Sequence, residues 1–161
     1  MKQPFVMLLR ALAMALAAAA VPTAAQPASQ VQLEGYVKRE TIVIDARGER
    51  RIALVDPVTV VPGDLLVMGT RYSNAGDSVI ENVVVSNPVP PAVRVAEVAD
   101  PAQVVSVDGG QSFGSFADQT VRAADGTDRP ATPDEITHFR WTIPAVAPGA
   151  SGAVEFLVTV R

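Results

Sequence analysis

Turn-forming residues recur roughly every 8 to 12 residues from residue 31 onward, and this rhythm limits the folds open to the chain. Pro, Gly, Asn and Asp mark these turns, and the stretches between them are rich in Val, Ile and Thr. No amphipathic segment with a helical period lies between the turns. This pattern predicts an all-β fold, with the strands arranged as a sandwich.

The last stretch, from Ile136 to Arg161, shows the alternation most clearly. Pro148 and Gly149 divide it into two halves, and each half places its large apolar residues at every second position: Phe139, Trp141 and Ile143, then Val154, Phe156, Val158 and Val160. Period-two alternation puts each set on one face of a strand. We therefore expect two half-buried strands joined by a loop, with Trp141 and Phe156 in the core.

The first 25 residues are expected to be a signal peptide. Lys2 and Arg10 give a basic start, an apolar run rich in Ala and Leu follows up to Val21, and small residues occupy the end of the segment, 23–25. The run is shorter than the roughly 20 apolar residues of a spanning helix, which disfavours a membrane anchor. Cleavage before Gln26 would leave a short polar arm at 26–30 and a single domain at 31–161.

Composition narrows the classes of partner and chemistry. Without Lys2 and Arg10, 11 basic residues stand against 17 acidic ones, a formal charge of −6. This balance disfavours nucleic acid and anionic lipid surfaces as partners. We also expect no stable membrane insertion once the signal is cleaved. The chain has no Cys, which removes disulfides, thiol catalysis and thiolate metal sites. We predict no cofactor.

The expected elements follow one another closely along the chain. Gly48 is placed in the turn of a hairpin between Thr41–Asp45 and Arg51–Val55, and prolines at 88, 90 and 91 predict a connection between sheets. The other expected strands are 31–38, 58–61, 66–73, 79–86, 93–98 and 119–123, with a hairpin at 104–116 and a long polar loop at 125–135.

Three motifs occur in an order that resembles the bacterial DUF11 repeat domain. They are Val61-Pro62-Gly63-Asp64-Leu65, then Ser73-Asn74-Ala75-Gly76, then Asn82-Val83-Val84-Val85-Ser86-Asn87-Pro88-Val89-Pro90. The stretch from Trp141 through Pro148, Gly149 and Phe156 to Val160 is similar to the closing segment of that family. The resemblance spans roughly Val58 to Val160. It implies an immunoglobulin-like antiparallel β-sandwich of about seven to nine strands, used as a structural or adhesive module of exported proteins.

The chain departs from that family in three ways. Asn87 stands where the family usually has Asp, a long segment from Asp100 to Glu135 is inserted, and the motif set occurs once rather than in a tandem array. A single copy does not fit the role of a spacer in a stalk.

Within the insert, Ser106-Val107-Asp108-Gly109-Gly110-Gln111-Ser112-Phe113 is similar to the Asp-box, S-x-D-x-G-x-T-W. Asp108 can accept hydrogen bonds from the backbone of the turn, Gly110 permits the reversal, and Phe113 caps the hairpin. In sialidase-like proteins this box is structural and lies away from the catalytic centre. We therefore interpret Ser106, Asp108, Gly110 and Phe113 as a structural motif.

Two features contain residue types that can bind a metal ion or catalyse a reaction. Asp125, Asp128, Asp134 and Glu135 supply oxygen ligands of the kind calcium prefers, but their spacing is not that of an EF-hand, and a solvated acidic loop is the simpler interpretation. His138 is the sole histidine and, by strand parity, lies opposite Phe139 and Trp141. No nucleophile elbow or phosphate loop accompanies it. We predict no catalytic residue and no metal site.

These inferences predict an exported, non-catalytic module that contacts another envelope or surface protein, either in the periplasm or at the cell surface. The alternative is a glycan- or calcium-binding module that uses the Asp108 hairpin and the acidic loop at 125–135. Within this hypothesis, the functional surface is expected at that loop or at the tip of the hairpin.

Overall fold

A computed structural model describes residues 30–98 and 103–161 of the chain. The described residues form ten strands and two short 3-10 turns: β1 (Val31–Ile44), β2 (Arg50–Val55), β3 (Leu65–Asn74), β4 (Ile80–Pro88), β5 (Val93–Glu97), β6 (Gln103–Ser106), η1 (Phe116–Asp118), β7 (Thr120–Arg122), β8 (Asp128–Pro130), η2 (Pro133–Glu135), β9 (His138–Val146) and β10 (Ser151–Val160). The predicted signal peptide at 1–25 and residues 26–29 of the polar arm lie outside the described residues.

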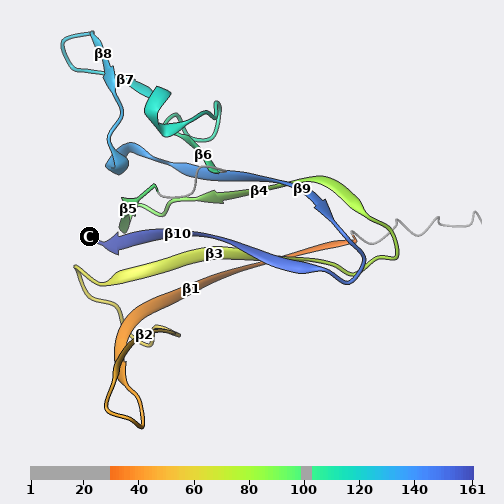
Figure 1. Cartoon of the computed structure of the whole chain (residues 1–161). Coiled ribbons are helices and arrows are strands. Elements are labelled where there is room, and N and C mark those ends of the chain that lie inside the picture. Colours follow the sequence, from red (N-terminus) through yellow and green to blue (C-terminus); the bar gives the residue numbers. More distant parts are fainter. Residues whose placement is uncertain (1–29, 99–102) are drawn as a thin grey trace, which may run out of the picture.

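Eight of the strands build two antiparallel sheets that lie one above the other (Figure 1). The larger sheet has the order β2-β1-β3-β10-β5, and the smaller has the order β4-β9-β6. Strands β7 and β8 form a separate hairpin above the smaller sheet. The predicted all-β sandwich is confirmed.

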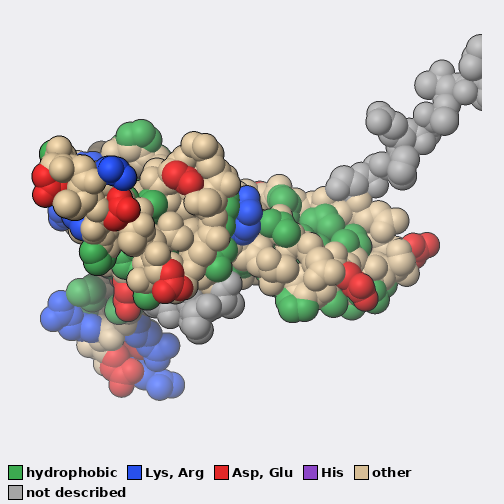
Figure 2. Space-filling view, turned by 90° about the horizontal axis from the view of Figure 1, so that it is seen from above, with side chains coloured by type: hydrophobic (Ala, Val, Ile, Leu, Met, Phe, Trp, Pro, Cys, Tyr) green, Lys and Arg blue, Asp and Glu red, His purple; other side chains and the backbone are tan. Residues whose placement is uncertain are grey.

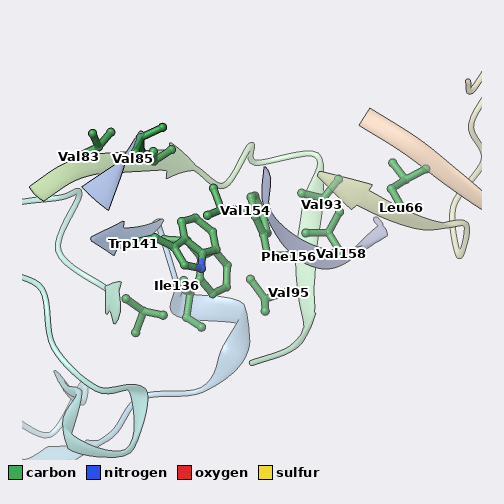
Figure 3. Close-up of a cluster of buried hydrophobic side chains, with 13 residues drawn as sticks. Leu66, Val83, Val85, Val93, Val95, Ile136, Trp141, Val154, Phe156 and Val158 are labelled. Atoms are coloured by element: carbon green, nitrogen blue, oxygen red, sulfur yellow. The ribbon is translucent and has the colours of Figure 1, made fainter. Parts of the chain in front are cut away.

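The core fills the space between these sheets (Figure 3). Phe139 and Trp141 of β9 point toward Phe156 of β10, and the Phe139 and Phe156 ring centroids are 4.6 Å apart. Valines surround the three rings, namely Val83, Val85, Val93, Val95, Val105, Val154 and Val158. Both faces predicted from the alternation of the last stretch therefore meet in one core.

Several connections cross from one sheet to the other, among them one after β4 and one after β9. The proline-rich segment after β4 leads to β5 in the larger sheet, as its three prolines predicted. The turn at Pro148 and Gly149 joins β9 of the smaller sheet to β10 of the larger one, and Gly149 has a φ of 71°. In an immunoglobulin constant domain the last two strands share a sheet, so this crossing sets the order of strands here apart.

Strand β1 is one long element where the sequence predicted two. Arg39 is paired with Leu66 of β3 on one side and with Val55 of β2 on the other, so the strand continues without interruption from one pairing to the next. The predicted hairpin is confirmed, with Gly48 at a φ of 81° in its turn. It extends beyond the body of the sandwich (Figure 1).

The inserted segment is more ordered than predicted in one place and less regular in another. The loop expected at 125–135 contains β8 and η2, because β8 pairs with β7. The hairpin expected at 104–116 is a tight reversal in which Val105 and Gly114 form one isolated bridge. Strand β6 pairs with β9 instead, so the tertiary ladder replaces the local one.

Candidate functional site

The Pro62-Gly63-Asp64 turn fastens the start of β3 to the end of β10. Gly63 has a φ of 93°, and its N–H donates to the Val160 carbonyl at 2.9 Å. The Asp64 carboxylate accepts the Val61 N–H at 3.0 Å, and the Asp64 carbonyl accepts the Val160 N–H at 3.0 Å. These residues therefore hold two strand ends together.

Asn74 and Gly76 hold the opposite end of the sandwich. The Asn74 amide is almost fully buried and donates to the carbonyls of Ser78 and Val146 at 2.7 and 2.9 Å. Its side-chain oxygen accepts the Gly76 N–H at 2.9 Å. The backbone of Asn74 also bonds to the turn that contains Pro148 and Gly149. One side chain therefore joins two loops.

Asn87, Pro88 and Pro90 line a hollow of about 400 Å³ between β4 and the inner face of β1. The Asn87 side-chain oxygen accepts a hydrogen bond from the Thr70 hydroxyl at 2.7 Å, which links the two sheets. Asn87 thus has a structural partner in the opposite sheet. The hollow also contains Val37 and Phe156 and has no charged residue in its lining.

Asp108 organises the Asp-box-like loop. Its carboxylate accepts hydrogen bonds from the hydroxyls of Ser106 and Ser112, both at 2.6 Å, and from the backbone N–H groups of Gln111 and Ser112, at 3.0 Å. These bonds hold the pKa of the Asp108 carboxyl well below its usual range, with the Ser106 bond the largest cause. Both carboxylate oxygens are engaged, so a cation would have to displace internal donors.

Gly110 and Phe113 complete this loop by packing against β9. Gly110 has a φ of 86°, and its N–H donates to the Ser106 hydroxyl at 2.9 Å. The Arg140 guanidinium carbon lies 3.4 Å from the centre of the Phe113 ring, and His138 meets that ring edge-on. The structure therefore brings Ser106, Asp108, Gly110 and Phe113 together in one loop.

The acidic loop is tied internally. The Glu135 carboxylate accepts hydrogen bonds from the two terminal guanidinium nitrogens of Arg129, at 2.9 and 2.6 Å, and from the Thr132 N–H at 2.9 Å. The Arg129 bond is the first cause that lowers the pKa of Glu135 to about 2. Asp125 accepts from Thr127 instead. Across residues 30–98 and 103–161, no group of three or more His, Asp or Glu side chains is placed to hold a metal ion.

Tyr36 and Arg71, whose proximity the sequence could not establish, meet on the outer face of the larger sheet. The Arg71 guanidinium carbon is 4.2 Å from the Tyr36 ring centre, and the Tyr36 hydroxyl donates to Glu155 across the intervening strand. Burial first, and then the bond to Glu155, raise the pKa of Tyr36 to about 12. The phenol therefore stays protonated at neutral pH and serves as a hydrogen-bond donor.

The surface that sequence reasoning missed is the outer face of the β1–β2 hairpin. Four large apolar side chains on it are 46–73% exposed: Ile42, Ile44, Ile52 and Leu54. Ile42 lies directly opposite Ile52, and the strand alternation puts all four on one face. A hollow of about 520 Å³ adjoins these side chains. Its lining consists of Ile42, Ile52, Glu40, Thr41 and Leu65. We name these four residues the hairpin face.

The apolar residues in 41–45 and 51–55 could have located this face, since the turn at Gly48 already predicted the hairpin. What the sequence could not show is that no other element covers the face in the described part of the chain. Lys and Arg side chains gather on the same hairpin, the fainter and more distant part at the lower left of Figure 2. They include Arg47, Arg50 and Arg51.

In comparisons with known proteins, no protein family, no curated protein and no solved structure matches this chain. Within the described ranges, no helix is long and apolar enough to cross a membrane.

Proposed function

We propose that this protein is an exported, non-catalytic β-sandwich that acts by binding another protein in the periplasm or at the cell surface. The export step rests on the basic start, the apolar run and the small residues within 1–25. The polar motif residues support a module without catalysis, because Asp64, Asn74 and Asp108 have hydrogen-bond partners within the fold. Asp108 and Glu135, the strongest candidates for ligand chemistry, are occupied by internal donors.

The hairpin face carries this proposal. Exposed apolar residues that occur singly are ordinary on protein surfaces, whereas a contiguous group marks a contact site. Ile44 and Ile52 are 73% and 71% exposed on a hairpin that extends away from the sandwich. Burying such side chains contributes roughly 1.5–3 kcal/mol each. A protein partner can cover both the apolar residues and the arginines around them.

Photocrosslinking in the cells that export the protein tests this proposal. A photoreactive amino acid replaces Ile42 or Ile52 on the hairpin face, and a matched control replaces Val84, which is 51% exposed on β4. We expect a discrete crosslinked species from the two hairpin positions and none from the control. The same protein captured equally from Val84, or no crosslink from either hairpin position, would contradict the proposal.

A further inference from the structure

Strand β2 forms one edge of the larger sheet. Its only partner among the described residues is β1, so its other side is an unpaired strand edge. At the hairpin turn the Asp45 N–H donates to the Glu49 carbonyl at 2.9 Å. Hydrogen-bonded and non-hydrogen-bonded residue pairs alternate along an antiparallel ladder. The backbone N–H and carbonyl groups of the odd-numbered β2 residues therefore point toward β1. The backbone N–H and carbonyl groups of Arg50, Ile52 and Leu54 therefore point to the free side.

The residues along this edge are complementary to their own copy. We propose that β2 pairs antiparallel with β2 of a second copy of this chain, with Ala53 opposite the same alanine. This register places Ile52 opposite Leu54 and Arg50 opposite Asp56, and each pair occurs twice because the arrangement has two-fold symmetry. Asp56 is 86% exposed on its side chain, and no ion pair engages Arg50 within residues 30–98 and 103–161.

Neighbouring registers lack this match. Only the even-numbered residues of β2 have backbone N–H and carbonyl groups on the free side. The pairing between the two copies can therefore shift only in steps that keep even-numbered residues opposite one another. Moving the pairing one way places Ile52 opposite itself and leaves Arg50 opposite Leu54. Shifting the pairing in the opposite direction places Ile52 opposite Asp56, which is unfavourable for an apolar side chain. A shift of one more step in the first direction places Arg51 opposite Arg51 of the second copy, and these like charges repel. Charge complementarity thus selects one register.

The paired strands would join the two larger sheets into one and unite the two hairpin faces. Lys38, which lies 2.7 Å from Asp56, would share that carboxylate with the incoming Arg50. Pro57 follows and cannot donate to a ladder, so pairing ends there. Because the contact is isologous, it closes at two copies and leaves no further β2 edge. This inference rests on the proposed function in that it uses the same hairpin for contact.

Cysteine crosslinking measures the register directly, because the natural chain has no Cys. In the proposed register Ala53 forms a non-hydrogen-bonded pair with its copy, the closer kind of pair in an antiparallel ladder. We expect the exported, processed Ala53→Cys protein to form a covalent dimer under mild oxidation. The controls Ile52→Cys and Val79→Cys should form no covalent dimer under the same conditions.

Sedimentation equilibrium of the unmodified protein should give the mass of two copies. Arg50→Asp and Asp56→Arg should each weaken the dimer by about tenfold, because attraction becomes repulsion at both symmetric pairs. The double variant Arg50→Asp/Asp56→Arg should restore it. A double variant as weak as the single ones would contradict the register.

A monomer at every concentration, a larger open assembly, or covalent dimers of Ile52→Cys in place of Ala53→Cys would overturn the inference. These failures remain distinct from failure of the proposed function. If the protein is monomeric but Ile42 and Ile52 still crosslink to a different protein in cells, the contact surface stands and only the second copy is excluded as its partner.

Discussion

At the scale of single residues, this fold depends on a few polar side chains that join separate loops. Asn74 serves the turn after β3 and the end of β9, and Asp108 holds a reversal that has only one ladder bridge. A buried polar group that has its partners rigidifies a structure, and the same group left without them is costly. The polar motif residues are therefore best understood as parts of the scaffold.

Asn74→Ala should lower the free energy of unfolding by about 2–4 kcal/mol, because two carbonyls and one N–H lose their buried partner. Urea denaturation measures this change. Asn82→Gly is the matched control, since Asn82 is exposed on β4 with a φ of 54° that Gly adopts without strain. Equal losses in the two variants would contradict the role assigned to Asn74.

Glu135 should make stability depend on acidity. Its pKa falls from 4.5 to about 2 in the folded state, mainly through Arg129. A carboxyl with a lowered folded pKa contributes its full stability above the unfolded pKa and loses it as the pH falls through the folded one. The free energy of unfolding should therefore decline between about pH 5 and pH 2.

Urea denaturation across that range checks this expectation. Glu135→Gln should show a shallower decline than the natural protein, because its side chain no longer titrates. Glu81→Gln, an exposed glutamate on β4, is the control and should follow the natural curve. Parallel curves for Glu135→Gln and the natural protein would exclude Glu135 as a contributor.

At the scale of elements, β1 connects the sandwich to its projecting hairpin. Near its middle, Tyr36 crosses β3 at Gly69 to reach Glu155 on β10. A Cβ on Gly69 would lie 2.6 Å from the Val154 carbonyl oxygen and 2.8 Å from the Tyr36 ring. Because Gly69 has no side chain, the Tyr36 ring of β1 can lie across β3 and reach β10.

Gly69→Ala should destabilise the protein by about 1–3 kcal/mol, because a strand carbonyl cannot move aside without disturbing the ladder. Gly35→Ala is the matched control on β1, where the new Cβ would meet the Gly69 carbonyl oxygen at an ordinary 4.0 Å. Thermal or urea denaturation compares the two variants. If Gly35→Ala proved the more harmful, the close approach at Gly69 would not explain the glycine.

At the scale of the whole molecule, one aromatic cluster joins the two sheets. Phe139 is fully buried, its ring centroid is 5.8 Å from that of Trp141, and Phe156 approaches it from the opposite sheet. The cluster lies where β9 and β10 face one another, far along the chain from β3, β4 and β5 that surround it (Figure 3). Its loss should affect the entire domain.

Phe139→Ala should lower the free energy of unfolding by about 3–5 kcal/mol and reduce hydrogen-exchange protection in both sheets. Val84→Ala, an exposed position on neighbouring β4, should change stability little. Exchange measured by mass spectrometry distinguishes a global from a local effect. Protection lost only in β9 would contradict a shared core.

Local pattern predicted the elements of this fold well, since turn residues and alternation act over a few positions. The inward faces of β9 and β10, the hairpin at Gly48 and the crossing after Pro88 are all confirmed. Sequence reasoning missed the continuity of β1, the pairing of β6 with β9, and the order in η2 and β8. Each of these depends on a partner that is distant or that alternation does not reveal.

The candidate contact surface divides in the same way. The sequence alone determined that residues 41–55 form a hairpin with apolar side chains, because β-propensity and a glycine turn are local properties. Only the tertiary structure decided that the smaller sheet does not cover this hairpin. It also decided that donors within the Asp108 loop occupy the Asp108 carboxylate. Whether a side chain is buried depends on which distant elements pack over it. The local pattern of residues in the sequence does not contain that information.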